Sequence, residues 1–183
     1  MRFWFRSLAV GALVGLGIGF VVGGTLGRIF MRVLFFTRQD TRGIETAMGA
    51  IIGELTSGGT VFICIFGAIM GVGLGLAYVG LRALLPSTAR WRAPLFVCAA
   101  SGLMLGFLVR INREDFALLP VTLSLLLIAG SVALTAAPVP VLVDRFAPDR
   151  EHTRGSAARA AVGAGMLAIA VYAVTGIAAA YGS

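Results

Sequence analysis

Charged side chains are scarce in this chain of 183 residues, and lysine is absent altogether. Only 13% of the residues are charged, whereas about 25% is usual in a soluble domain. Hydrophobic residues make up 58% of the chain, and the mean hydropathy is +0.96. This composition excludes a separate soluble domain and predicts a single transmembrane domain over residues 1–183.

Side chains that often carry chemistry are also few. The chain has one histidine and two cysteines. His152 has no neighbour at the spacing of metal ligands, and Cys64 and Cys98 are expected on the order of 20 Å apart, beyond disulfide reach. The apolar segments have no ionisable residue in their middle, and no nucleophile can be paired with a base. We therefore predict no enzymatic activity, no catalytic or metal-binding residue and no cofactor.

All fifteen basic residues are arginine, and the net charge is +7. The arginines gather at the ends of apolar segments, where they fix the orientation of a membrane protein and contact lipid headgroups. The charge therefore indicates membrane lipid as a partner and gives no reason to expect nucleic-acid binding.

Five apolar segments lie between these charges and predict an all-α integral membrane bundle of about five transmembrane helices. The predicted spans are residues 7–35, 60–84, 93–110, 118–143 and 158–181. Pro138 and Pro140 predict a kink in the fourth span. The long outer connection, residues 36–59, contains a weakly apolar piece at 47–52. This piece fits an interfacial helix, a hairpin or a re-entrant segment, and we favour a lid over the helix ends.

The distribution of arginine predicts the orientation. With the N-terminus in the cytoplasm, nine arginines lie on the cytoplasmic side and six on the opposite side. By the positive-inside rule, the N-terminus is expected inside and the C-terminus outside. Because this bias is small, a dual topology stays open as the alternative.

Glycines follow one another at strict four-residue spacing in the first span. In water such a run would destabilise a helix, because each glycine costs about 1 kcal/mol relative to alanine. In a bilayer the helix persists, and the bare glycine row allows a second helix to approach closely. The second span carries a similar row. We therefore predict glycine-zipper packing through Gly11, Gly15, Gly19, Gly23, Gly27, Gly67, Gly71 and Gly75.

The first two spans share a sequence pattern. Residues 11–19 read GALVGLGIG and residues 67–75 read GAIMGVGLG, with matching glycines 56 positions apart. Because successive spans run in opposite directions, the match resembles the inverted repeats of transporters. Independent selection for small residues is the interpretation we favour. Each helix also carries a second smooth face, which predicts two close neighbours for each; these faces are formed by Gly17 with Gly24 and by Gly73 with Gly80.

One cluster of charges is expected on the outer side of the membrane. Arg28 and Arg32 lie one helical turn apart at the outer end of the first span. Opposite charges near a low-dielectric boundary tend to pair, so these arginines are expected to bind acidic residues of another loop, Glu114 or Asp115. A site for an anionic ligand or partner is the alternative. The predicted outer charge cluster comprises Arg28, Arg32, Glu54, Arg110, Arg113, Glu114 and Asp115.

Three short motifs carry a resemblance to known proteins. GRIFMR at 27–32, ELTSGGTV at 54–61 and INREDFALL at 111–119 are similar to segments of a group of small polytopic bacterial membrane proteins without an assigned activity. The resemblance implies a protein of the bacterial cytoplasmic membrane and nothing catalytic.

These features predict a non-enzymatic integral membrane protein, a structural or accessory component that binds membrane partners or lipid. The partner would be a second copy of the chain, another membrane protein or membrane lipid. The alternative is a small oligomeric channel or transporter, which the glycine repeat favours and the lack of a mid-membrane charge disfavours.

Overall fold

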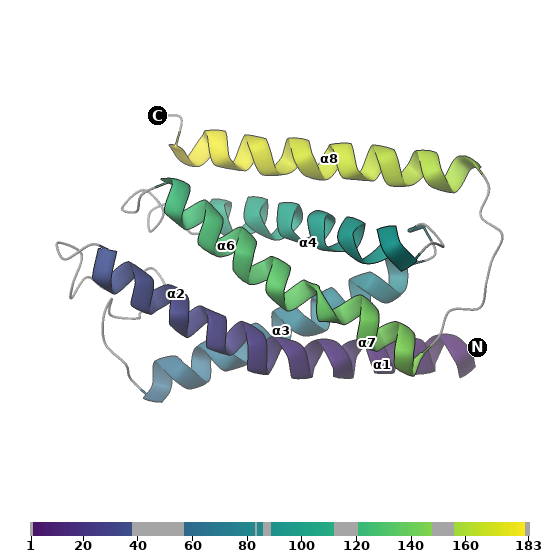
Figure 1. Cartoon of the computed structure of the whole chain (residues 1–183), viewed down its shortest axis with the longest axis horizontal. Coiled ribbons are helices and arrows are strands. Elements are labelled where there is room, and N and C mark those ends of the chain that lie inside the picture. The colour runs from purple at the N-terminus through teal and green to yellow at the C-terminus, as the bar shows by residue number, and fades with distance from the viewer. Residues whose placement is uncertain are drawn as a thin grey trace.

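The computed structural model describes residues 2–37, 57–82, 84–85, 89–111, 121–147 and 156–181. In these ranges the chain is helical and has no strand, which confirms the all-α prediction. Five long helical rods run antiparallel to their neighbours in sequence (Figure 1). We call the end of the bundle where the first rod begins the N-terminal end, and the opposite end the far end.

The first rod consists of α1 (Arg2–Ile18), the π-helical turn η1 (Gly19–Gly23) and α2 (Gly24–Thr37). In the π-helical turn, the backbone N–H of Gly24 donates to the carbonyl oxygen of Gly19, five residues earlier. Such a turn holds about one residue more than an α-helical turn. The extra residue changes the direction in which the side chains of α2 face.

The other rods are α3 (Ser57–Leu81), α4 (Ala89–Ile111), the pair α6 (Val121–Ala136) and α7 (Pro138–Phe146), and α8 (Ser156–Tyr181). Four segments are long and apolar enough to cross a membrane: Trp4–Phe30, Ser57–Leu81, Arg90–Arg110 and Thr122–Phe146. They correspond to the first four predicted spans. The apolar part of α8, Ala164–Ala179, is shorter, so a fifth span at α8 stays a prediction.

The fourth rod divides into α6 and α7 at Ala137, beside its two prolines, and the kink predicted there is not found (Figure 1). Pro138 and Pro140 occupy the first turn of α7, where backbone N–H groups have no partner within the helix. Proline fits there because it has no N–H to satisfy. The backbone of Ala137 keeps helical dihedral angles (φ −57°, ψ −44°), and α7 continues along the line of α6 (Figure 1).

The helices pack around two groups of buried side chains. The larger group joins α1, α3, α4, α6 and α7, and includes Tyr78, Phe96 and Val143. The smaller group contains Val109 and Ile128 and joins α4 to α6. α8 lies on the outside of the bundle and packs chiefly against α4 (Figure 1).

Glycine backbones make very close contacts between α1 and α3. A Cβ atom built at Gly15 would collide with the carbonyl oxygen of Gly71, and one built at Gly71 would collide with the carbonyl oxygen of Gly15. A Cβ atom at Gly11 would lie 2.8 Å from the carbonyl oxygen of Gly75. Gly19 and Gly67 face each other in the same way. At these positions any larger residue would push the two backbones apart.

The rest of the predicted row packs less evenly toward the far end. A Cβ atom at Gly23 would lie 3.4 Å from Cα of Gly67, which is ordinary contact. A Cβ atom at Gly27 would lie 2.6 Å from Cγ2 of Ile63, which is the end of a side chain. The closest backbone contact is therefore confined to α1, the start of η1 and the facing part of α3.

The second smooth faces do not pack as predicted. Cβ atoms built at Gly17, Gly73 and Gly80 would meet nothing within 4 Å, so these glycines face no neighbouring helix among the described residues of one copy. Gly24, expected beside Gly17, instead packs against Cys64, whose Sγ would lie 2.9 Å from its Cβ. The extra residue in η1 turns Gly24 toward α3. The prediction of two close neighbours through these faces is wrong.

Candidate functional site

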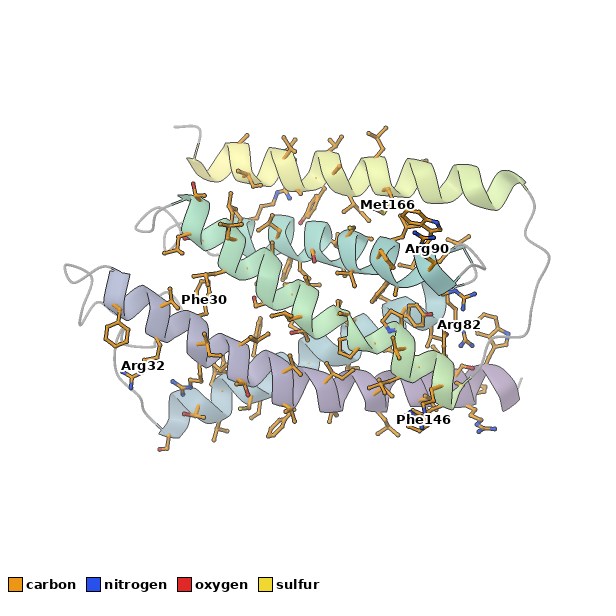
Figure 2. All side chains as sticks on the ribbon, viewed as in Figure 1. Phe30, Arg32, Arg82, Arg90, Phe146 and Met166 are labelled. Atoms are coloured by element: carbon orange, nitrogen blue, oxygen red, sulfur yellow. The ribbon has the colours of Figure 1, made fainter. Side chains whose placement is uncertain are left out.

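Arg82 is buried directly after α3, at the N-terminal end of the bundle (Figure 2). Only 3% of its surface is exposed. Its Nη1 donates to the carbonyl oxygen of Ala147 (2.7 Å), and its Nη2 donates to Oγ of Ser7 (2.9 Å). Ser7 is fully buried in α1. Because a buried charge needs hydrogen bonds in place of its hydration, these bonds hold α1, α3 and the end of α7 together.

A second polar junction lies one helical turn away along α3. Oδ2 of Asp144, in α7, accepts hydrogen bonds from the hydroxyl of Tyr78 (2.7 Å) and from Nη1 of Arg92 (3.1 Å). Tyr78 is fully buried, and its ring meets that of Phe96 edge to face, with 5.1 Å between centroids. Asp144 therefore joins α3, α4 and α7.

The sequence pattern does not predict these two junctions. By position alone, Arg82, Arg92 and Asp144 are charges near the ends of spans, where they fix orientation. The available signal is the spacing of Tyr78 and Arg82, which lie four residues apart and so on one face of α3. Which carboxylate or hydroxyl meets that face depends on the packing of α1 and α7.

At the far end, Arg28 and Arg32 project from α2, one helical turn apart. Nη2 of Arg28 donates to Oγ1 of Thr60 near the start of α3. The guanidinium of Arg32 lies 5.9 Å from the centre of the Phe36 ring, a cation–π contact within α2. Arg28 is half-buried and Arg32 is exposed. Arg28 therefore ties α2 to α3, while Arg32 stays at the surface.

Arg110 makes a fourth polar contact between helices, where α4 ends. Its Nη2 donates to Oγ1 of Thr175 (2.7 Å), and its guanidinium lies 3.8 Å from the centre of the Tyr172 ring. A Cβ atom at Gly176 would lie 3.1 Å from Nη1 of Arg110, so the glycine leaves room for the guanidinium. These contacts attach α8 to α4.

Four members of the predicted outer charge cluster lie outside the described residues: Glu54, Arg113, Glu114 and Asp115. The expected ion pairs of Arg28 or Arg32 with the acidic members therefore stay predictions. The three described members, Arg28, Arg32 and Arg110, all lie at the far end of the bundle, where Arg110 contacts α8 and Arg28 contacts α3. Two of them, Arg28 and Arg110, bind a threonine of a neighbouring helix, and these threonine partners are not evident in the sequence.

A groove of about 480 Å³ runs along α2 at the far end. Its lining residues follow the spacing of a single helix face, and they are Thr25, Arg28, Ile29, Arg32, Val33 and Phe36. The surface of the groove is almost entirely apolar and wide open, because Arg28 and Arg32 line it with the aliphatic parts of their side chains.

Metal ligands are few in the described ranges. No three His, Cys, Asp or Glu side chains come together among the described residues. Cys64 lies against Gly24, and Cys98 is exposed.

Comparisons with known proteins give no match: no protein-family model fits the chain, and no curated protein or solved structure is similar to it.

Proposed function

We propose that the chain is a non-enzymatic integral membrane protein of the bacterial cytoplasmic membrane, an accessory or structural component that binds membrane partners or lipid. The observation that carries the proposal is the use of its polar side chains. Arg82, Asp144 and Arg110 each bond to neighbouring helices near an end of the bundle. Polar side chains in membranes often hold helices together in this way. Large apolar residues are exposed along the rods between these ends, among them Leu13, Ile69, Leu126 and Leu167.

The close contact of α1 with α3 supports a glycine zipper as the rigid centre of this protein. In a bilayer, helices associate through van der Waals packing and interhelical hydrogen bonds, because lipid is as apolar as a helix surface. The facing glycines Gly15 and Gly71 bring backbone against backbone. The hydrogen bonds from Arg82 and Arg28 then add polar contacts at the two ends of the same pair.

The proposed topology has five spans, with the N-terminus in the cytoplasm and the C-terminus outside. The antiparallel order of the rods and the length of α8 support five spans with the termini on opposite sides, and the excess of arginine supports a cytoplasmic N-terminus. In it, Arg82 and Arg92 lie on the cytoplasmic side, and Arg28 and Arg110 lie on the outer side.

A small oligomeric channel or transporter is the second candidate, and one observation favours it. α1 and α3 run in opposite directions, and their glycine rows face each other with Gly15 against Gly71 at the centre. These two glycines occupy equivalent places in the two copies of the sequence pattern. Such a local two-fold relationship is the arrangement that inverted repeats give to transporters.

Reconstitution into lipid vesicles separates the two candidates. We expect vesicles that contain the protein to leak protons, potassium and chloride no faster than protein-free vesicles. A flux that depends on the protein would overturn the accessory role and support the second candidate. Purification after crosslinking in the native membrane is the complementary measurement, and we expect it to recover a second copy or another membrane protein with the chain.

A further inference from the structure

The groove on α2 is shaped like a site for an elongated ligand. Its lining runs from Thr25 to Phe36, which is roughly 16 Å along a helix at 1.5 Å per residue. Ile29 and Phe36 are 50% and 69% exposed, so their apolar surfaces are open to a ligand. In Figure 1, α2 and α3 diverge toward the far end, and the Arg28–Thr60 hydrogen bond links them there.

The two arginines of the groove lie at a similar depth in the membrane. Arg28 and Arg32 lie in α2, the half of the first rod nearest the far end, and Arg28 bonds to Thr60 near the start of α3. Arginines at this position lie at the boundary between hydrocarbon and headgroups, where lipid phosphates are found. Figure 2 shows Arg32 on the opposite side of α2 from Phe30, which faces the bundle.

Guanidinium groups one helical turn apart suit a phosphate. Arginine presents a planar fork of donors that binds phosphate oxygens in pairs. Arg28 is fixed by its bond to Thr60, and Arg32 is held near the Phe36 ring, so both cations are partly positioned before a ligand arrives. Ile29 and Thr25 continue the groove away from the headgroup boundary, toward the hydrocarbon.

We propose that this groove binds an anionic phospholipid. The phosphate lies between Arg28 and Arg32, and one acyl chain lies along Ile29 toward Thr25. This inference rests on the proposed membrane role and names the lipid class and the residues that bind it. A free phosphate ion shares the headgroup chemistry and lacks the acyl chain, so the two sources are distinguishable.

Lipid titration of the purified protein in a neutral detergent tests this proposal. The thermal unfolding midpoint is measured with increasing phosphatidylglycerol, with phosphatidylcholine and with inorganic phosphate. We expect a saturable rise with phosphatidylglycerol and a much smaller one with the other two. Arg32→Gln is expected to weaken the response to phosphatidylglycerol about tenfold, which corresponds to ~1.4 kcal/mol.

Arg90→Gln is the matched control, because Arg90 is also exposed and stacks on an aromatic ring, that of Trp91, at 6.0 Å, at the other end of the bundle. We expect this variant to respond like the wild-type protein. Arg32→Lys keeps the positive charge but lacks the planar fork of donors. Its response to phosphatidylglycerol should lie between those of the wild-type protein and Arg32→Gln, and this variant keeps the test valid if Arg32→Gln unfolds. Equal losses in Arg32→Gln and Arg90→Gln, or a full response to inorganic phosphate alone, would overturn the proposal. The lipid site is tested by the unfolding midpoint, whereas the accessory role is tested by vesicle flux. Failure of one proposal can therefore be distinguished from failure of the other.

Discussion

Ser7 accepts a hydrogen bond of 2.9 Å from Arg82, and this bond joins the start of α1 to the residue after α3. The bond from Arg28 to Thr60 joins the same two rods near their other ends. Between the two bonds, the rods touch through glycine backbones. A hydrogen bond from an arginine to a hydroxyl thus joins the two rods at each end of the pair. Between these ends, the rods are joined by close packing.

Replacing Ser7 by alanine should destabilise the protein, because Arg82 is buried and loses one of its acceptors. We expect a cost of about 1–3 kcal/mol, seen as a lower midpoint of thermal unfolding in detergent. Thr122→Ala removes an exposed hydroxyl from another rod and serves as the control. Equal midpoints for the two variants would contradict the buried role of the Ser7–Arg82 bond.

Asp144→Asn should cost more than the loss of an exposed ion pair, which is typically about 0.2–1 kcal/mol. The substitution removes the charge that faces Arg92, whose side chain is 13% exposed. Arg145→Gln, at the exposed neighbouring position, is the control and should have little effect. Combining Asp144→Asn with Tyr78→Phe should be less harmful than the sum of the two single changes, by about 0.5–3 kcal/mol. Strict additivity in this double-mutant cycle would show that the junction does not act as a unit.

The helical organisation could be predicted because it depends on local features. Apolar length defines four of the rods, whereas the kink predicted from Pro138 and Pro140 is not found at Ala137. The hydroxyls of Ser131 and Thr135 donate to carbonyl oxygens of their own helix, as expected for such residues in an apolar segment. The glycine spacing indicates the close contacts of Gly11, Gly15 and Gly19 with α3, but it does not indicate that Gly24 also faces α3.

The polar junctions could not be predicted in this way, because they depend on how distant segments meet. Tyr78 and Asp144 are 66 positions apart and belong to rods that are not consecutive. The π-helical turn is a second example. Nothing in the spacing of glycines indicates an extra residue at Gly19–Gly23, yet this turn decides that Gly24 faces α3. At the far end, the threonine partners of Arg28 and Arg110 likewise require the structure.

Tyr172→Leu should loosen α8. The substitution removes the ring that lies 3.8 Å from the guanidinium of Arg110, a contact worth on the order of 0.5–2 kcal/mol. We expect faster hydrogen exchange in Ala164–Ala179 and unchanged exchange in α3. Val171→Ala changes the adjacent exposed position and should leave both rates unaltered. If the rate of hydrogen exchange in Ala164–Ala179 were the same in Tyr172→Leu and Val171→Ala, the Arg110 contact would not be what attaches α8.

The orientation can be measured by labelling single cysteines in intact cells, after Cys64 and Cys98 have been replaced by alanine. A cysteine at Ser183 or Arg42 should react with an impermeant reagent from outside, and one at Thr88 should not. The reason is the excess of arginine on the side assigned to the cytoplasm. Labelling of Thr88 from outside would reverse the proposed orientation, and labelling of both sides would indicate a dual topology.

The central claim is that α1 and α3 pack backbone against backbone, and Gly15→Ala tests it most directly. The added methyl group would collide with the carbonyl oxygen of Gly71, so we expect destabilisation by about 1–3 kcal/mol from overpacking. Gly17→Ala, two positions along the same helix, meets nothing within 4 Å and should leave the midpoint of thermal unfolding unchanged or raise it, because alanine favours a helix. A clearly lower midpoint for Gly15→Ala alone is the result we predict. Equal midpoints for Gly15→Ala, Gly17→Ala and the wild-type protein would contradict this account.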